Sequence, residues 1–389
     1  MTVSTLKTIH PFPARMAPEI ARAAVQSLKP RSTLLDPMCG SGTVLRCAVE
    51  SEVRAIGFDL DPLAVLMARS WVTPVDPARL MHDAHVVLQA AKELPLDEIK
   101  LFWHDQETSA FVGYWFARQQ RLQLGALAAV LRNTMLPTRD ALMVALSRMI
   151  VTKEGGASLA RDVSHSRPHR VAMENTYDVY EGFITSVRAL LRRLQPELIR
   201  SEAEVSQGDC RDLGQVGDSS IDCVITSPPY LNAIDYLRGH RLSLVWLGFS
   251  ASEIRSIRSD SVGAERSAPT CLVDVEQYVS SESGSSLPGR YIGWIRRYYA
   301  DASLIVREIT RVLKPGGQLV LVVGNSFLRG CVVDNARIVR DLLEEHGLQG
   351  IEWREREIPA RRRYLPPPSG NSPLAFRMRA EVVLSGTMS

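Results

Sequence analysis

The distribution of apolar and polar residues along the chain predicts alternating strands and helices at its beginning. Short apolar runs over residues 33–35 and 54–58 are each followed by a helical pattern, over residues 44–51 and from Pro62 onward. Proline is tolerated in the first turn of a helix because its missing N–H would have no partner there. This strand–helix–strand–helix order is the beginning of a parallel, doubly wound sheet.

The sheet pattern stops near Pro74 and returns near Val205. Between these points apolar residues recur at three- and four-residue spacing, which is typical of amphipathic helices. The spacing predicts helices over residues 111–133, 139–151 and 177–194. We therefore interpret residues 75–200 as a mainly helical insertion into an α/β domain that comprises residues 1–74 and 201–389.

After the insertion the pattern again predicts buried strands. These cover residues 205–209, 221–225, 318–323 and 380–384, with a helix over 291–312 and a turn at 314–317. We expect residues 250–290 to form an irregular loop region within the α/β domain, because its serine-rich part lacks an apolar period.

Composition places the chain among ordinary globular proteins, with 45% hydrophobic and 23% charged residues. No apolar run approaches the ~18–20 residues of a membrane span, and the N-terminus lacks the apolar core of a signal peptide. We therefore expect a cytoplasmic protein without membrane contact. The six cysteines are scattered without a Cys-x-x-Cys pair, which predicts reduced thiols and no metal site. The net charge of +3 permits a nucleic-acid partner but does not require one.

A glycine-containing loop follows the first predicted strand. Gly40 and Gly42 let the backbone approach a ligand closely, and the helix that follows begins with unpaired N–H groups. The dinucleotide fingerprint is absent, because Leu45 occupies the position of its third glycine. Asp59 ends the next strand, where a carboxylate can accept hydrogen bonds from two ribose hydroxyls. The pattern predicts a nucleoside-bearing cofactor, and a structural turn with an unrelated acid is the alternative.

A second loop, Ser227-Pro228-Pro229-Tyr230, follows the predicted strand at 221–225. Consecutive prolines stiffen the backbone and leave carbonyls that no local N–H satisfies. The Ser227 hydroxyl and the Pro228 carbonyl are acceptors, and Tyr230 has a flat aromatic face. This set suits a planar substrate that bears an amine, whereas a rigid turn with a core tyrosine is the alternative.

Together the two loops resemble the signature motifs of the DNA amino-methyltransferases, the S-adenosylmethionine-dependent enzymes that modify cytosine N4 or adenine N6. Segments 10–15, 57–62 and 208–210 are similar to further cofactor motifs of that family, and segment 313–317 to a motif of Rossmann-like methyltransferases in general. The resemblance covers residues 8–72 and 203–389. It implies a Rossmann-like class I methyltransferase fold, α/β in class, whose doubly wound, mostly parallel sheet has an antiparallel last strand.

The resemblance also implies roles for individual residues. It implies catalysis by Ser227, Pro228, Pro229 and Tyr230, which would bind the amine of a base flipped out of the duplex. It implies S-adenosylmethionine as cofactor, DNA as substrate and a cognate restriction endonuclease as a candidate partner. The residues that would bind the cofactor are Pro11, Phe12, Arg15, Asp36, Met38, Cys39, Gly40, Ser41, Gly42, Thr43, Asp59, Leu60, Asp209 and Cys210.

The identity of the target base depends on Ser227. Serine at this position is more typical of the N4-cytosine enzymes of the family, and aspartate or asparagine of the N6-adenine enzymes. The cofactor loop precedes the catalytic loop here, whereas many serine-type enzymes have the reverse order, so adenine stays open. A tRNA guanine-N2 methyltransferase is a second alternative because it shares both loops. A catalytically inactive nucleic-acid-binding protein is a third.

Basic residues outside these motifs are candidates for nucleic-acid contacts. One group lies in the polar segment 161–170 and another follows the catalytic loop, and a solvated surface is the alternative for each. The residues are Arg161, His165, Arg167, Arg238, His240 and Arg241. The insertion of residues 75–200 and the region of residues 250–290 are the candidates for recognition of the target sequence.

Overall fold

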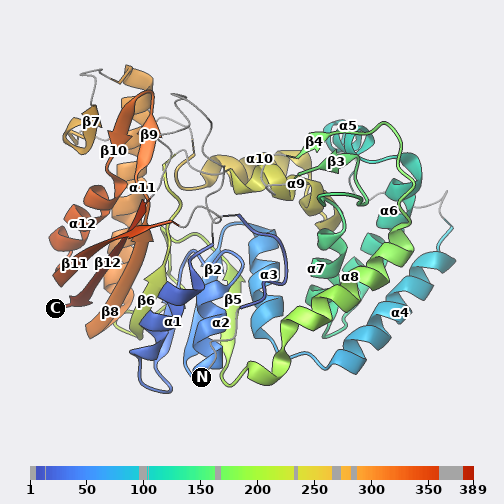
Figure 1. The fold of residues 1–389 in the computed structure, drawn as a ribbon, viewed down its shortest axis with the longest axis horizontal. Helices are drawn as coiled ribbons and strands as arrows, with labels where there is room; N and C mark the ends of the chain where they lie inside the picture. The colour runs from blue at the N-terminus through green and yellow to red at the C-terminus, as the bar shows by residue number, and fades with distance from the viewer. Residues whose placement is uncertain are drawn as a thin grey trace.

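The computed structural model describes residues 6–13, 15–95, 103, 105–162, 168–231, 235–264, 273–281, 287–358 and 380–389. Its centre is a seven-stranded sheet in the order β11-β12-β8-β6-β1-β2-β5 (Figure 1). The strands are β1 (Thr33–Asp36), β2 (Arg54–Asp59), β5 (Ala203–Gln207), β6 (Ile221–Thr226), β8 (Leu313–Val323), β11 (Leu348–Glu357) and β12 (Ala380–Met388).

Strand direction confirms the predicted fold class. The pairs β1–β2, β1–β6, β2–β5 and β6–β8 are parallel. Only β12 runs against its neighbours in this sheet, since it pairs antiparallel with both β8 and β11. The sheet is therefore Rossmann-like, mostly parallel, with an antiparallel last strand.

Helices cover both faces of the sheet, as neighbouring residues of β1 illustrate. Leu34 and Leu35 are both fully buried, but they belong to different apolar cores because successive strand residues point to opposite faces. Helices α1 (Pro18–Gln26) and α2 (Thr43–Glu50) contribute to the core of Leu34. Helices α11 (Gly289–Val312) and α12 (Asn335–Glu345) contribute to that of Leu35.

The insertion consists of helices packed beside the sheet (Figure 1). They are α4 (Pro77–Glu93), α5 (Gln106–Trp115), α6 (Arg118–Asn133), α7 (Arg139–Arg148) and α8 (Val179–Leu194). These helices share one core with α3 (Pro62–Val72) and α9 (Tyr236–Leu247), to which Trp71 and Trp246 belong. The insertion is therefore joined to the α/β part through a common apolar interior.

One predicted helix of the insertion is two helices. The pattern over residues 111–133 is interrupted at Phe116, which has an extended backbone with φ −135° and ψ 133°. Its ring is buried and meets Trp246 edge-on, with ring centroids 5.1 Å apart. Apolar packing across the break preserves the helical period in the sequence, so the period did not reveal the break.

The second half of the chain differs from the prediction at two places. Residues 314–317 belong to strand β8 rather than to a separate turn, and the pairing with β6 shifts register there, with Gly316 at φ +75°. Residues 250–290 are not wholly irregular, because Ser250 and Glu253 form a capping box that begins α10 (Ala251–Asp260).

Smaller elements complete the description. Strand β10 (Cys331–Val333) pairs with β7 (Val279–Ser281) and β9 (Ser326–Leu328), and β3 (Ala160–Arg161) pairs with β4 (His169–Arg170). Residues Pro196–Leu198 and Glu276–Tyr278 form short 3-10 helices. None of the described helices combines the length and apolarity that a membrane span needs.

Candidate active site

The two predicted loops leave the same edge of the sheet side by side. Strands β1 and β6 are parallel neighbours, with Leu35 opposite Val224. At their ends, the Thr226 hydroxyl donates a hydrogen bond to the Asp36 carboxylate, with 2.6 Å between Oγ1 and Oδ1. The chain turns to β2 on one side of β1 and reaches β6 on the other, and such a reversal of strand order opens a ligand-binding crevice.

The glycine loop has a backbone that other residues adopt with strain. Gly40 has φ +50° and Gly42 has φ +86°. A Cβ atom on Gly42 would lie 2.9 Å from the Cα of Ala68, so helix α3 leaves no room for a side chain there. The Asp59 carboxylate accepts hydrogen bonds from the N–H of Gly40 at 2.8 Å and of Asp61 at 2.9 Å. The end of β2 therefore holds the loop in place.

Two hydroxyl groups in this loop fit a bound cofactor. The side-chain oxygens of Ser41 and Thr43 are buried, and neither has a hydrogen-bond partner among the described residues. Buried polar atoms are rarely left without a partner, so a ligand in the loop is the natural source of one. Together with the Asp59 carboxylate, these groups suit the amino-acid and ribose portions of S-adenosylmethionine.

Burial raises the pKa values of Asp36 and Asp59, the two acids that flank the loop. Burial raises the pKa of Asp36 to about 7, although hydrogen bonds from Thr226 and Met38 act in the opposite direction. Burial, helped by the negative charge of Asp61, raises the pKa of Asp59 to about 6. The carboxyl that would bind the ribose thus ionises close to neutral pH.

Asp209 already has a strong partner that the sequence pattern did not reveal. The Arg211 guanidinium binds it at 2.6 Å through Nη2 and at 2.9 Å through Nε, and also binds Asp301 of α11 at 2.8 Å. Burial alone would raise the pKa of Asp209, but the hydrogen bonds from Arg211 lower it overall. Cys210 is buried beside this pair, and burial raises the pKa of its thiol. The predicted role of Asp209 and Cys210 at the cofactor adenine stays a prediction.

The remaining predicted cofactor residues differ in accessibility. Met38 and Leu60 are half-buried at the ends of β1 and β2, whereas Cys39 is buried. The Cys39 N–H donates to the carbonyl of Phe58 at 2.8 Å, a bond that links the two strand ends. Cys39 therefore supports the loop through its backbone.

The loop predicted to be catalytic, residues 227–230, presents acceptor atoms. Ser227 Oγ donates its proton to the carbonyl of Val322 on β8 at 3.0 Å, so its lone pairs are left to accept. No hydrogen bond within the described residues uses the Pro228 carbonyl. Pro229 is half-buried. These atoms provide two adjacent acceptors at the edge of the sheet.

The side chain of Tyr230, the last residue of this loop, lies beside that of Ser227, the first. Its hydroxyl lies 3.4 Å from Ser227 Oγ, and its ring packs in part against the core that includes Leu321 and Tyr298. Burial raises the pKa of the Tyr230 phenol. Its position beside Ser227 matches the predicted set of an aromatic face and two acceptors.

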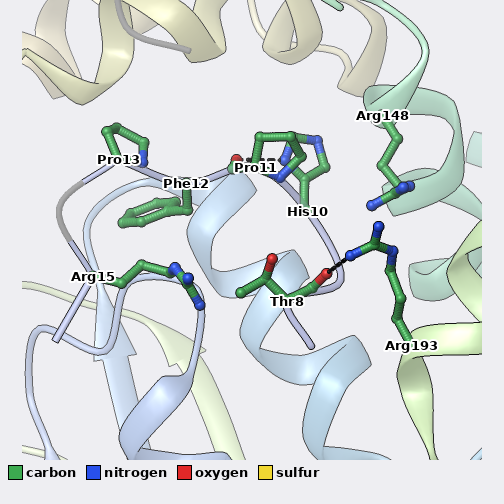
Figure 2. Close-up of a pocket in the computed structure, with 8 residues that line it drawn as sticks. All are labelled: Thr8, His10, Pro11, Phe12, Pro13, Arg15, Arg148 and Arg193. Atoms are coloured by element: carbon green, nitrogen blue, oxygen red, sulfur yellow. Dashed lines mark hydrogen bonds between the residues drawn. The ribbon is translucent and has the colours of Figure 1, made fainter. Parts of the chain in front are cut away.

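The N-terminal motif lies over the glycine loop. The Phe12 ring edge is 3.0 Å from where a Gly40 Cβ atom would be, and its centroid is 5.4 Å from that of His240. Pro11, Phe12 and Arg15 line a pocket of about 300 Å³ (Figure 2). The opposite wall includes Arg148 of α7 and Arg193 of α8, which the sequence pattern did not single out.

His240 is an interior residue, which corrects its predicted role as a phosphate contact. Only 5% of its surface is exposed, because α9 turns this side chain inward against Phe12 and the start of α3. Its Nδ1 atom is hydrogen-bonded to the Asp61 carboxylate, which also accepts from the N–H of Leu63 at the start of α3. Its buried Nε2 atom has no partner in the described part of the chain.

The other basic candidates remain partly accessible or outside the description. Arg238 is exposed, and the half-buried Arg241 lies over the rings of Phe111 and Trp115 at 5.4 and 5.6 Å. Arg161 donates to the carbonyls of Ser158 and Ala160 at 3.0 and 2.7 Å. The predicted contacts His165 and Arg167 lie outside the described residues.

The described residues contain no group of three metal-ligating side chains.

Comparison with known proteins points to one class of enzyme. A family described as the RMKL-like methyltransferase domain matches residues 8–70. The type II methyltransferase M.MvaI of Kocuria varians is 22% identical over 96% of this chain and 89% of its own length. The type II methyltransferase M.BsoBI of Geobacillus stearothermophilus is 18% identical over 82% of this chain and 74% of its own length.

A solved structure of a methyltransferase also aligns with the chain. It is an S-adenosylmethionine-dependent methyltransferase from Methanosarcina mazei, 12% identical, with a TM-score of 0.34 over 96% of this chain and 99% of its own.

Proposed function

We propose that this chain, which its relatives indicate to be an S-adenosylmethionine-dependent DNA methyltransferase, methylates the exocyclic N4 amine of cytosine. The observation that carries the proposal is the position of Ser227-Pro228-Pro229-Tyr230 directly beside the glycine loop, joined to it by the Thr226–Asp36 hydrogen bond. This arrangement brings amine acceptors to the edge of a cofactor site.

The acceptors would act on the electron pair of the amine. In free cytosine this pair is delocalised into the ring, which makes the nitrogen a poor nucleophile. Ser227 Oγ and the Pro228 carbonyl would accept one N–H each, and the geometry of two such bonds would turn the electron pair away from conjugation with the ring and toward the methyl donor. Ser227 suits this role because its own proton is donated to Val322. Positioned acceptors of this kind act by orientation and electrostatics.

Tyr230 would hold the flipped base. A base in a duplex has to leave the stack before its amine can reach a buried site, at a cost of a few kcal/mol. Stacking on an aromatic ring contributes about 1–3 kcal/mol per base and offsets that cost. The Tyr230 phenol is neutral at physiological pH, as an ordinary tyrosine is, and burial raises its pKa further, so the ring presents no charge to the base.

The cofactor is S-adenosylmethionine, which supplies a methyl group on a positively charged sulfur. Ser41 and Thr43 would bind its polar groups through their buried hydroxyls, and Asp59 would accept hydrogen bonds from the ribose. Asp59 keeps lone pairs for this although it already accepts from Gly40 and Asp61, because a carboxylate has about four acceptor positions. The N–C bond would form as the S–CH3 bond of the cofactor breaks, which leaves a neutral thioether, and the methylated amine would then release a proton to solvent.

Adenine N6 is the second candidate target. The observation in its favour is the order of the motifs, since the cofactor loop at 36–43 precedes the catalytic loop at 227–230. The acceptors would serve the adenine amine in the same way, because it too is conjugated with its ring. The choice between the two bases therefore rests on Ser227.

Target recognition is proposed for the helical insertion of residues 75–200 together with the exposed Arg238. The insertion lies beside α3 in Figure 1, and its helices share the core of α9. A cognate restriction endonuclease is proposed as a partner because the relatives are type II methyltransferases. Action on cytoplasmic DNA is part of the same proposal.

Methyl transfer to DNA and to tRNA, measured side by side, tests the proposal. The protein is incubated with radiolabelled S-adenosylmethionine and either unmethylated genomic DNA or unmodified tRNA. We expect label in DNA and none in tRNA, and we expect Ser227→Ala to reduce incorporation while cofactor affinity stays normal. Label in tRNA alone would contradict a DNA substrate. Full incorporation by Ser227→Ala would contradict the role of the hydroxyl.

A further inference from the structure

Two arginines from different helices of the insertion meet in the pocket beside the cofactor loop. Figure 2 shows the guanidinium groups of Arg148, at the end of α7, and Arg193, near the end of α8, pointing toward each other. Arg15 lies on the far side of the same pocket, beside Phe12. Three cationic side chains thus surround a space of about 300 Å³.

The described residues supply no counter-charge for the facing pair. No ion pair in the described part of the chain includes Arg148 or Arg193. Burial, followed by the charges of Arg193 and Arg192, lowers the pKa of Arg148 to about 10. Two like charges held together in a partly buried space repel each other, and an anion between them removes that cost.

Donor groups remain for such an anion. Arg148 donates from Nη1 to the carbonyl of Ile9, and Arg193 donates from Nη1 to the carbonyl of Thr8 at 2.9 Å. A guanidinium has five N–H donors, so each arginine keeps most of its own. The Nε atom of Arg148 is buried and has no partner within the described residues. The backbone contacts fix the two groups in position and leave their other donors for the pocket.

We propose that the side of this pocket formed by Arg148 and Arg193 binds a phosphodiester group of the DNA substrate. Paired guanidinium groups match the tetrahedral oxygens of a phosphate through several charged hydrogen bonds. Pro11, Phe12 and Pro13 provide an apolar wall against which a sugar can pack. The site rests on the proposed function, since it concerns the same DNA.

The position of the pocket fits a substrate strand better than the cofactor. Phe12 stands at the boundary, because its ring lies against Gly40 of the cofactor loop and also lines the pocket. The two facing arginines come from the insertion and lie across the pocket from Phe12 (Figure 2). Phe12 also contacts His240 of α9, the helix that follows the catalytic loop, so the pocket borders the place where the base would enter.

Charge-neutral substitutions test the proposal. Arg148→Gln and Arg193→Gln keep a hydrogen-bond donor for the Ile9 and Thr8 carbonyls but remove the charge. Arg192→Gln is the matched control, because Arg192 is exposed on the same helix and does not line the pocket. The readouts are the affinity for a fluorescent DNA duplex of mixed sequence across a salt series and, separately, the affinity for S-adenosylmethionine.

We expect each pocket variant to bind DNA about ten-fold more weakly at low salt. We also expect the slope of log affinity against log salt to fall by about one, the change for a single phosphate contact. In the double variant this slope should also fall by only about one, because both arginines would contact the same phosphate. Arg148→Lys should restore part of the affinity, Arg192→Gln should change the slope little, and cofactor affinity should stay unchanged.

Other results would overturn the proposal. Equal losses in Arg192→Gln and the pocket variants would show a general effect of charge. Weaker cofactor binding with normal DNA binding would assign the pocket to the cofactor carboxylate. Unchanged DNA binding in correctly folded pocket variants would leave the arginines a purely structural role. If the native chain bound no DNA, the proposed function itself would fail, which is distinct from these outcomes.

Discussion

The hydroxyl of Ser227 has one proton and two lone pairs, and in this fold the proton is used in a hydrogen bond to the backbone. Strand β8 places the Val322 carbonyl 3.0 Å from Ser227 Oγ, so the hydroxyl donates its proton there and keeps lone pairs with which to accept. A serine in solution could either donate or accept. Tertiary structure, through a strand almost a hundred residues later in the chain, thus decides the chemistry of this residue.

The ring of Tyr230 should matter more than its hydroxyl. Tyr230→Ala removes the surface on which the base stacks, worth about 1–3 kcal/mol, and should lower kcat/KM about ten- to hundred-fold. Tyr230→Phe keeps the ring and should retain most activity. The measurements are methyl-transfer kinetics and cofactor affinity, which should be normal in both variants. Near-normal turnover in Tyr230→Ala would rule out the stacking role.

Cofactor affinity should depend on pH through Asp59. The folded-state pKa of about 6 lies above the ordinary value, so the carboxyl takes up a proton as pH falls through 6 and loses its capacity to accept from the ribose. Affinity for S-adenosylmethionine should therefore weaken about ten-fold for each pH unit below 6. Calorimetric titrations between pH 5 and 8 measure this. An affinity that is constant over that range would contradict the ribose role, and Asp59→Asn should remove the dependence.

Motif residues could be recognised from the sequence, but their partners could not. The positions of Asp36, Asp59 and Ser227 at strand ends follow from the chain pattern, and the structure places all three at one edge of the sheet. The Arg211 contact with Asp209 and the inward turn of His240 depend on which face of a neighbouring element each side chain meets. A single sequence holds no signal for such contacts between distant elements.

At the scale of elements, the cofactor loop is shaped by the helix behind it. Gly42 needs both a positive φ and the absence of a side chain, because a Cβ atom would meet Ala68 of α3 at 2.9 Å. Gly316 in β8 also has a positive φ, but a Cβ atom there would have no neighbour within 4 Å. Comparison of Gly42 with Gly316 therefore separates the energetic cost of a positive φ from the cost of a steric clash with a neighbouring helix.

Gly42→Ala should destabilise the protein more than Gly316→Ala. The conformational cost alone is about 1 kcal/mol, and the collision with α3 should add about 1–3 kcal/mol for Gly42. Urea unfolding of both variants measures the difference in the free energy of unfolding. Equal losses would mean that α3 moves aside without cost, and the loop would then be less rigid than the structure indicates.

Elements with a clear apolar period were predictable, and those without it were not. Strands β1 and β6 are short apolar runs, and α8 begins and ends within two residues of its predicted bounds. Strand β11 escaped prediction because it lies at the edge of the sheet and carries mostly exposed, charged residues. Helix α10 escaped because only Ile254 is buried on it, so the pattern carries no helical stripe.

At the scale of the whole molecule, one buried arginine joins the insertion to the α/β part. Arg46 of α2 donates to the carbonyls of Trp71 at the end of α3 and of Leu194 at the end of α8, at 2.7 and 2.9 Å. It also binds Gln195 and Glu50. The last carbonyls of a helix have no partner within the helix, and Arg46 satisfies them for two helices together.

Arg46→Met should therefore destabilise the entire chain. Loss of the guanidinium leaves several buried carbonyls and the partly buried Glu50 without a strong partner, which costs about 3–5 kcal/mol. Arg22→Met is the matched control, since Arg22 lies 3.8 Å from Glu50 and is partly exposed, and should cost less than about 1 kcal/mol. Urea unfolding should show one cooperative transition for each variant. Separate transitions for the insertion and the sheet in the native chain would contradict their shared core.

The account as a whole depends on which atom receives the methyl group. The most direct measurement is mass analysis of nucleosides from DNA that the native protein has methylated. N4-methylcytosine is the predicted product, in agreement with Ser227 as an acceptor beside the cofactor loop. N6-methyladenine would contradict the assignment of cytosine, and the absence of any methylated nucleoside from active, cofactor-binding protein would contradict DNA methylation itself.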